Sequence, residues 1–213
     1  MAETRDERPL GRLEAFSDGV FAIAITLIVL ELGVSASAGH HLLRAILDQW
    51  PSFLAYVTSF LTIGVIWLGH SGITGALRTA DVTLYRLNLL VLLLVSFLPF
   101  PTKLLAEFFG KSGPERVAAV FYGLTLLALS LSLTAFVRYA VEDRRLVKDH
   151  VSQETVDEAL GHEPSLVLYA AGIAVSFLLP TLAVTLYLMT ALYLGIPART
   201  VQRLLRRRWR HPG

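Results

Sequence analysis

The sequence predicts an all-α integral membrane protein, and both composition and hydrophobic patterning point to it. Apolar residues make up 54% of the 213 residues and charged residues only 17%, whereas soluble domains contain about 25% charged residues. Several apolar runs approach the length of a membrane-spanning helix, which is about 20 residues. No run is repeated, so residues 1–213 are interpreted as one transmembrane domain. Because the chain has no Cys, disulfides, thiolate metal sites and cysteine nucleophiles are excluded.

The first span is predicted at residues 16–33, inside the segment around which the rest of the chain is organised. Arg12–Leu32 opens with charges, passes a Phe16-Ser17-Asp18 triplet and continues as a nearly uninterrupted apolar run. A signal peptide cleaved after Ala36-Ser37-Ala38 is the alternative interpretation. Acidic residues before and beside the apolar run oppose it, because a signal peptide begins with a basic region.

Three further long apolar segments are predicted to cross the membrane. The second span begins beside Pro51-Ser52, a pair typical of a helix start, and the third contains two prolines. Before the second span, His40–Trp50 is short and amphipathic, so we expect it to lie at the membrane interface. These three spans are placed at residues 53–71, 84–105 and 117–140.

The last apolar segment, Pro164–Ile196, is too long for one span and is broken by Pro180. We therefore expect two short helices, at residues 165–179 and 181–195. The polar stretch that precedes them, Val141–Glu163, is expected to contain a short surface helix.

The distribution of Lys and Arg supports six spans. With six spans both termini lie on one side of the membrane, and that side holds 15 of the 19 basic residues. Short basic segments stay in the cytoplasm, so both termini are predicted to be cytoplasmic in a multi-pass protein of the inner (cell) membrane. The basic segment Arg203–Arg210 is interpreted either as a topology anchor or as a contact with anionic membrane lipids.

The first helix has two different faces. At about 100° per residue, a stripe about 100° wide contains Ile23, Thr26, Leu27 and Leu30. Asp18 falls on the nearly opposite face. An acid inside the membrane is costly and is a functional candidate by default.

Asp18 needs polar partners, and the next two spans carry candidates. Trp67 and His70 share a face of the second span because they are three residues apart. His70 is expected at the depth of Asp18, and Asn88 near the same end of the third span. A donor beside a carboxylate lowers the cost of burying it, so we expect a network of Arg12, Ser17, Asp18, Trp67, His70 and Asn88. In the alternative interpretation, Ser17 or Asp18 only caps the first helix and His70 lies at the interface.

Catalytic and metal-binding patterns are absent from the sequence. No G-x-S-x-G elbow accompanies His70 and Asp18, so a hydrolase is not indicated. His40 and His41 are adjacent, no H-E-x-x-H motif occurs, and His162 has no second ligand at helical spacing. No P-loop, dinucleotide fingerprint or Gly-Tyr-Gly potassium filter is found. We therefore expect no enzymatic activity, no cofactor, no bound metal apart from permeant ions and no nucleic-acid partner.

One family shares these patterns. Arg12-x-x-x-Phe16-Ser17-Asp18 and the following Gly19–Leu27 resemble the signature of the transmembrane protein 175 family, potassium channels of endosomes and lysosomes with prokaryotic relatives. Trp67-Leu68-Gly69-His70, Leu87–Leu90 and Phe97–Thr102 are supporting matches. The resemblance is close over the first half of the chain and extends to the rest only in topology. Gly69 departs from the pattern, because a polar Asn is expected before His70.

The resemblance implies a homotetramer, since prokaryotic members carry one six-helix repeat, with a central pore lined by the first helix of each subunit. The selectivity filter would be a hydrophobic ring of Ile23, with Leu27 and Leu30 further out and the Thr26 hydroxyl beside it. The Arg-Phe-Ser-Asp residues would not line this pore. They would hold the first helix against the second and third through a network behind the pore, made of Arg12, Phe16, Ser17, Asp18, Trp67, His70 and Asn88.

The stripe agrees with this implied function on physical grounds. Apolar rings in a narrow tube expel water and bar ions, so a permeant cation must lose hydration there. Large, weakly hydrated cations should pass more easily, which favours K⁺ over Na⁺. Glu31 at the outer mouth would raise the local cation concentration or would simply be a solvated helix end.

The sequence is also compatible with two other classes of function. A proton-coupled or other secondary transporter would use Asp18 and His70 as a relay, although the inverted repeat common in transporters is not evident. A membrane enzyme or scaffold without conductance is the third class. A potassium-selective channel remains the leading hypothesis.

Overall fold

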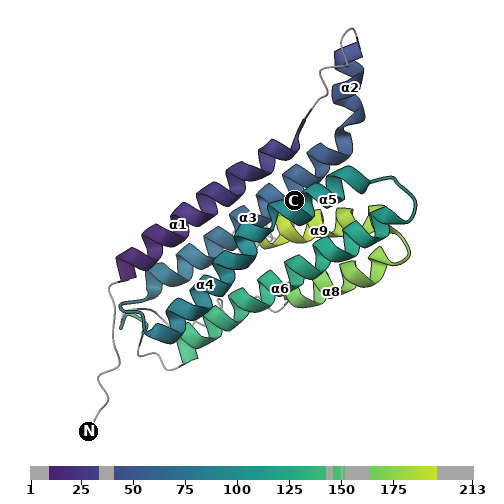
Figure 1. Ribbon diagram of the computed structural model, residues 1–213. Coiled ribbons are helices and arrows are strands. Elements are labelled where there is room, and N and C mark those ends of the chain that lie inside the picture. Colours follow the sequence, from purple (N-terminus) through teal and green to yellow (C-terminus); the bar gives the residue numbers. More distant parts are fainter. Residues whose placement is uncertain (1–9, 34–40, 143–145, 150, 152–163, 196–213) are drawn as a thin grey trace, which may run out of the picture.

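The computed structural model describes residues 10–33, 41–142, 146–149, 151 and 164–195, and its regular elements there are helices (Figure 1). Within these ranges four helical segments are long and apolar enough to cross a membrane. They are α1 with a 3₁₀ turn η1 (Leu10–Leu27 and Ile28–Glu31), α3 (Trp50–Ala76), α4 with α5 (Val82–Phe97 and Pro99–Phe108), and α6 (Pro114–Glu142). The chain is therefore an all-α, multi-pass membrane protein.

Three shorter helices complete the described fold. α2 (Leu42–Asp48) projects beyond the end of the bundle (Figure 1), and its three leucines, Leu42, Leu43 and Leu47, are exposed. α8 (Pro164–Ser176) and α9 (Pro180–Gly195) are apolar but have only 13 and 16 residues. They lie beside each other along α6, and α9 also contacts α3.

The first helix starts earlier than the sequence predicts. α1 already includes Leu10 and buries Leu13, so the helix begins before residue 16, and its last turn from Ile28 is 3₁₀ in geometry. Ser17 and Asp18 thus lie inside the helix, and the alternative in which one of them caps it is wrong. The reason is that the charged segment before the apolar run also has a buried face, which extends the helix toward the N-terminus.

The third span is divided into two helices. α4 ends at Phe97 and α5 begins at Pro99, because a proline has no backbone N–H and its ring crowds the preceding turn. Leu98 keeps a helical backbone, and its carbonyl accepts hydrogen bonds from both the backbone N–H and the Oγ1 hydroxyl of Thr102, at 3.2 and 2.8 Å. The chain therefore continues across the break as one membrane-length segment, Val82–Phe108.

Pro180 separates the two C-terminal helices. α8 ends at Ser176 and α9 begins at Pro180, within a few residues of the expected boundaries of 165–179 and 181–195. The Tyr187 ring of α9 is fully buried beside Tyr122 and Tyr169. Glycines at 123 and 172 leave the space that this ring fills, since a Cβ at either position would meet it.

A buried set of hydroxyl groups ties α3, α5 and α6 together. Ser59 Oγ lies 2.7 Å from Thr102 Oγ1 and 2.9 Å from Tyr122 Oη. All three side chains are at most 1% exposed. In a bilayer the helices have no hydrophobic drive to associate with one another, so such interhelical hydrogen bonds and close packing hold the bundle together.

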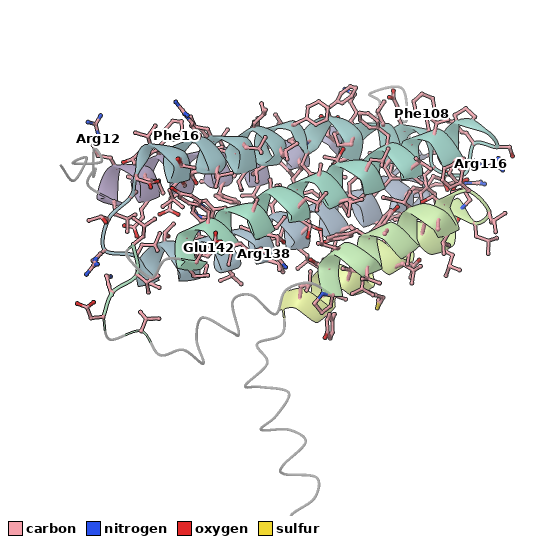
Figure 2. All side chains as sticks on the ribbon, turned by 90° about the horizontal axis from the view of Figure 1, so that it is seen from below. Arg12, Phe16, Phe108, Arg116, Arg138 and Glu142 are labelled. Carbon is pink, nitrogen blue, oxygen red and sulfur yellow. The ribbon has the colours of Figure 1, made fainter. Side chains whose placement is uncertain are left out.

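Charged residues lie at both ends of the bundle. Arg12, Arg138 and Glu142 lie toward one end, and Arg116 lies at the other end together with Phe108 (Figure 2). At the first end a short loop pairs with the α3–α4 turn through an antiparallel bridge between Leu77 and Val147. Most of the polar stretch predicted to hold a surface helix lies outside the described residues, as do His40, His162 and the basic segment Arg203–Arg210.

Candidate functional site

The face of α1 that packs against its own chain is defined by a helical repeat of small and apolar residues. Leu13, Ser17, Phe21 and Ala24 are each at most 2% exposed, and Ile28 of η1 continues the row. Spacings of three and four residues place them on one side of the helix. This face contacts α3 and α4, so Ser17 is the polar residue of the first helix that faces the interior.

Ser17 is hydrogen bonded to Asn88 on α4. The Asn88 Nδ2 group donates to Ser17 Oγ at 3.0 Å, and the Ser17 hydroxyl donates to the Leu13 carbonyl one turn earlier at 2.8 Å. The other end of the same amide, Asn88 Oδ1, lies 2.7 Å from His70 Nε2 on α3. A single amide therefore bridges α1 and α3, and all three side chains are at most 1% exposed.

Two aromatic rings contact the His70 ring. Its ring is stacked on Phe136 of α6, with centroids 5.1 Å apart at an interplanar angle of 18°. Phe21 of α1 covers it at 5.4 Å. The alternative in which His70 is an interfacial residue is therefore wrong. Phe136 was not singled out from the sequence, because a Phe on a long apolar helix carries no local sign of its partner.

Asp18 lies apart from this buried chain of hydrogen bonds. It is on the exposed side of α1, and its carboxylate accepts a hydrogen bond of 2.8 Å from Trp67 Nε1. Trp67 is itself 39% exposed. The predicted residues thus form two separate groups: a buried one that joins α1, α3 and α4 through Asn88, and an exposed one that joins α1 to α3 through Asp18 and Trp67.

The two remaining residues expected in the network make no polar contact in it. Arg12 is exposed and forms no hydrogen bond or ion pair with another described residue. Phe16 is 57% exposed and lies with Arg12 near one end of the bundle (Figure 2). Among the described residues the network behind the proposed pore therefore receives no polar contact from Arg12, and a packing role of Phe16 stays a prediction.

The apolar stripe of α1 faces away from the bundle of its own chain. Ile23, Leu27 and Leu30 are 61%, 42% and 72% exposed. Thr26 is exposed as well, and its hydroxyl group lies 2.9 Å from two carbonyl oxygens of its own helix, those of Ala22 and Ile23. The four side chains thus form one outward surface. Because the Thr26 hydroxyl hydrogen is directed to its own helix, Thr26 Oγ1 can only accept hydrogen bonds on this surface. Such a surface needs either lipid or other copies of the chain to cover it.

Glu31 at the far end of the first helix is paired. Its Oε2 atom lies 3.5 Å from Nζ of Lys103 on α5, and its side chain is only 22% exposed. The interpretation of Glu31 as a solvated helix end is therefore wrong. The local sequence does not reveal Lys103 as the partner of Glu31, because the two residues are far apart in sequence and on different helices.

Within the described residues, no group of three or more His, Asp or Glu side chains could hold a metal ion. Among the described residues, the polar groups near α1 are a three-residue chain of hydrogen bonds, a hydrogen-bonded pair and an ion pair. They suit the positioning of a helix, and none of them places a nucleophile beside a base.

Comparisons with known proteins point to one family. Residues 12–99 match the family described as "Endosomal/lysosomal potassium channel TMEM175". A potassium channel of Streptomyces collinus is 46% identical over 126 residues, which is 59% of this chain and 61% of that protein. A potassium channel of Chamaesiphon minutus is 37% identical over 202 residues, which is 92% of this chain and 98% of the relative.

A solved structure extends the similarity to the fold. The crystal structure of a lysosomal potassium-selective channel TMEM175 homolog from Chamaesiphon minutus superposes with a TM-score of 0.77 at 36% identity. The superposition covers 87% of this chain and 96% of that chain. The similarity therefore includes the C-terminal helices, which the family match over residues 12–99 does not reach.

Proposed function

Because this chain belongs to the TMEM175 family of potassium channels, we propose that it is a potassium-selective cation channel whose ion path is lined by the outward stripe of α1. The observation that carries the proposal is the division of α1 into two faces. One face is locked to α3 and α4 through Ser17 and Asn88, and the other exposes Ile23, Leu27 and Leu30 away from the bundle. Because this family consists of ion channels, the chain transports ions and is not an enzyme.

A ring of subunits follows from this geometry. One helix cannot enclose a pore, so several copies must bring their α1 stripes together around a symmetry axis. We propose a homotetramer, in which each of Ile23, Leu27 and Leu30 contributes a ring of four side chains. The partners of the chain are then its own copies, the surrounding membrane lipids and monovalent cations, with no cofactor.

Selectivity in this pore comes from the cost of dehydration. Apolar rings offer no oxygen ligands in place of water, so an ion passes only by shedding part of its hydration shell. K⁺ holds its water less tightly than Na⁺ and meets the lower barrier. Ile23, Thr26, Leu27 and Leu30 are assigned to the filter, and the groups behind the pore keep α1 at a fixed radius.

The chain is placed in the inner membrane with six crossings and both termini in the cytoplasm. Support comes from the excess of Lys and Arg on the side of the termini and from the separation of Arg12 and Arg138 from Arg116 along the bundle (Figure 2). α8 and α9 would complete the six crossings as short helices, about 20 and 24 Å long at 1.5 Å per residue.

The test is flux in vesicles that contain the purified full chain. A channel gives downhill K⁺ flux that exceeds Na⁺ flux and does not need a pH gradient, and native mass spectrometry shows four copies of the 23.5 kDa chain. Saturable flux driven by a pH gradient through a monomer would instead establish the transporter with an Asp18 and His70 relay. Tetramers with no conductance would establish a scaffold.

A further inference from the structure

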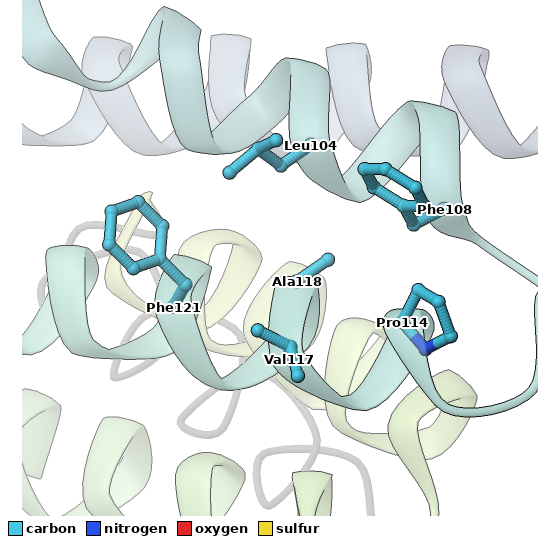
Figure 3. A pocket seen from close by; sticks show the side chains of 6 residues that line it. All are labelled: Leu104, Phe108, Pro114, Val117, Ala118 and Phe121. Carbon is cyan, nitrogen blue, oxygen red and sulfur yellow. The ribbon is translucent and has the colours of Figure 1, made fainter.

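An apolar cavity of about 500 Å³ opens between α5 and α6, at the end of the bundle where these helices are joined (Figure 3). Leu104 and Phe108 line it from α5, and α6 supplies the other side with Pro114, Val117, Ala118 and Phe121. α1 contributes no lining residue, so the cavity is separate from the proposed ion path. Its size is within the range of ligand sites, about 300 to 1,000 Å³.

The chemistry of the lining selects a hydrocarbon occupant. All six lining residues are apolar, and a water molecule in such a cavity would lack the two to four polar partners it needs. The cavity lies between segments that cross the membrane, where the surrounding solvent is lipid acyl chain. An acyl chain therefore gains contacts in the cavity at no cost in lost hydrogen bonds.

One cation lies beside the lining of this cavity. Lys111 Nζ lies 5.3 Å from the ring centroid of the lining residue Phe108. The Lys111 side chain is exposed and forms no ion pair with another described residue. Arg116 lies at the same end of the bundle as Phe108 (Figure 2), but its position on α6 is turned away from the face that lines the cavity.

Two acids also occur at this end of the bundle. The Glu115 carboxylate accepts a hydrogen bond from Thr181 Oγ1 of α9, at 3.1 Å, so it is directed toward the C-terminal hairpin. Glu107 is exposed on α5. The apolar cavity with Lys111 beside its lining matches a molecule that has a hydrocarbon tail and an anionic head.

We propose that the α5–α6 cavity binds one acyl chain of a membrane phospholipid, whose phosphate lies beside Lys111. The lipid packs between the two helices as a structural ligand of each subunit. This site goes beyond the proposed channel function and stands whether or not the chain conducts ions.

Photo-crosslinking tests which molecule occupies the cavity. Benzoylphenylalanine is placed at Val117, which lines the cavity, or at Val167 on α8, which is the matched control because both valines are 70% exposed. The full chain is reconstituted in vesicles of phosphatidylglycerol and phosphatidylcholine, extracted into detergent, washed and irradiated. We expect phospholipid adducts at position 117 to persist after washing and those at 167 to disappear.

Charge removal tests the headgroup contact. The variant Lys111→Gln should lose affinity for phosphatidylglycerol by about fivefold, since one cation near the membrane surface contributes about that factor. Arg44→Gln, which removes another exposed cation, should retain the lipid. These positions are exposed, so elution as a single species checks that the variants fold.

Three results would each overturn the proposal. The first is equal adduct yield at 117 and 167 after washing, and the second is unchanged lipid retention in Lys111→Gln. The third is a crosslink from position 117 to another copy of the chain, which would assign this face to a subunit interface.

Discussion

His70 Nε2 lies 2.7 Å from Asn88 Oδ1, and this contact joins α3 to α4 directly behind α1. The same amide donates from Nδ2 to Ser17 Oγ, and Ser17 donates to its own helix at Leu13. When the amide is oriented this way and His70 donates from Nε2, the hydrogen bonds run in one direction, from His70 through Asn88 and Ser17 to the Leu13 carbonyl. Each donating atom in this series then has an acceptor. Asn88 is the member that contacts both of the others.

The first prediction concerns this central amide. Asn88→Leu keeps a similar volume but leaves Ser17 and His70 without their partner, which should destabilise the folded chain by about 1–3 kcal/mol. Ser96→Ala on the same helix is the control, since that hydroxyl bonds only to its own helix at Leu93. Reversible unfolding in detergent measures both variants. Equal stability of N88L and wild type would show that the amide bridge does not hold α1.

The second prediction concerns the exposed pair of Asp18 and Trp67. Trp67→Phe and Asp18→Ala each remove one hydrogen bond, worth about 0.5–1.5 kcal/mol, whereas Asp18→Asn keeps an acceptor for the indole N–H. We expect Asp18→Ala to reduce assembly or alter gating, and Asp18→Asn to retain more of both. Size-exclusion profiles and single-channel recordings measure these effects. An Asp18→Ala protein that assembles and conducts like wild type would remove the role proposed for this residue.

The third prediction concerns the proposed filter. Ile23→Asn would place amide groups in the proposed ring of Ile23 side chains and lower the cost of Na⁺ dehydration, so discrimination between K⁺ and Na⁺ should fall by about tenfold, equivalent to about 1.4 kcal/mol. Leu93→Asn on α4 is the control, because Leu93 is 63% exposed where Ile23 is 61% exposed. Ion flux in vesicles measures both ratios. An unchanged ratio in I23N would exclude Ile23 from the filter.

The fourth prediction concerns the ion pair at the far end of the first helix. Lys103→Gln frees the Glu31 carboxylate, which then attracts cations, so K⁺ conductance should rise by about twofold at low ionic strength. At high salt the difference should vanish, because such charges are screened. The exchanged pair Glu31→Lys/Lys103→Glu restores the contact and serves as control. Conductance that is the same in K103Q and wild type at low salt would separate this pair from the ion path.

The fifth prediction concerns the space filled by Tyr187. Gly123→Ala would push a Cβ against the Tyr187 ring and its hydroxyl and also against Ile173, with an expected cost of about 1–3 kcal/mol. Gly64→Ala is the control, since its Cβ would meet open space. Tyr187→Phe removes the nearest atom and should partly rescue Gly123→Ala. Thermal unfolding followed by size exclusion measures the series, and a Gly123→Ala protein as stable as wild type would contradict the packing described here.

The membrane-spanning segments could be predicted because their signal is local. Long apolar runs locate α1, α3 and α6, and Pro180 marks the break before α9, since both features depend only on neighbouring residues. Boundaries were less predictable. The start of α1 depends on the burial of Leu13 against other helices, which no property of residues 10–16 reveals.

The sequence by itself determined that the chain crosses the membrane as helices and that α1 has an apolar stripe, because the helical repeat alone sets which residues share a face. The tertiary structure alone decided the partners of each polar residue. It placed Ser17 inside beside Asn88, left Asp18 on the exposed side with Trp67, and paired Glu31 with Lys103. These contacts depend on the depth and rotation of one helix against another, which are set by packing over the whole bundle and leave no trace in the local sequence.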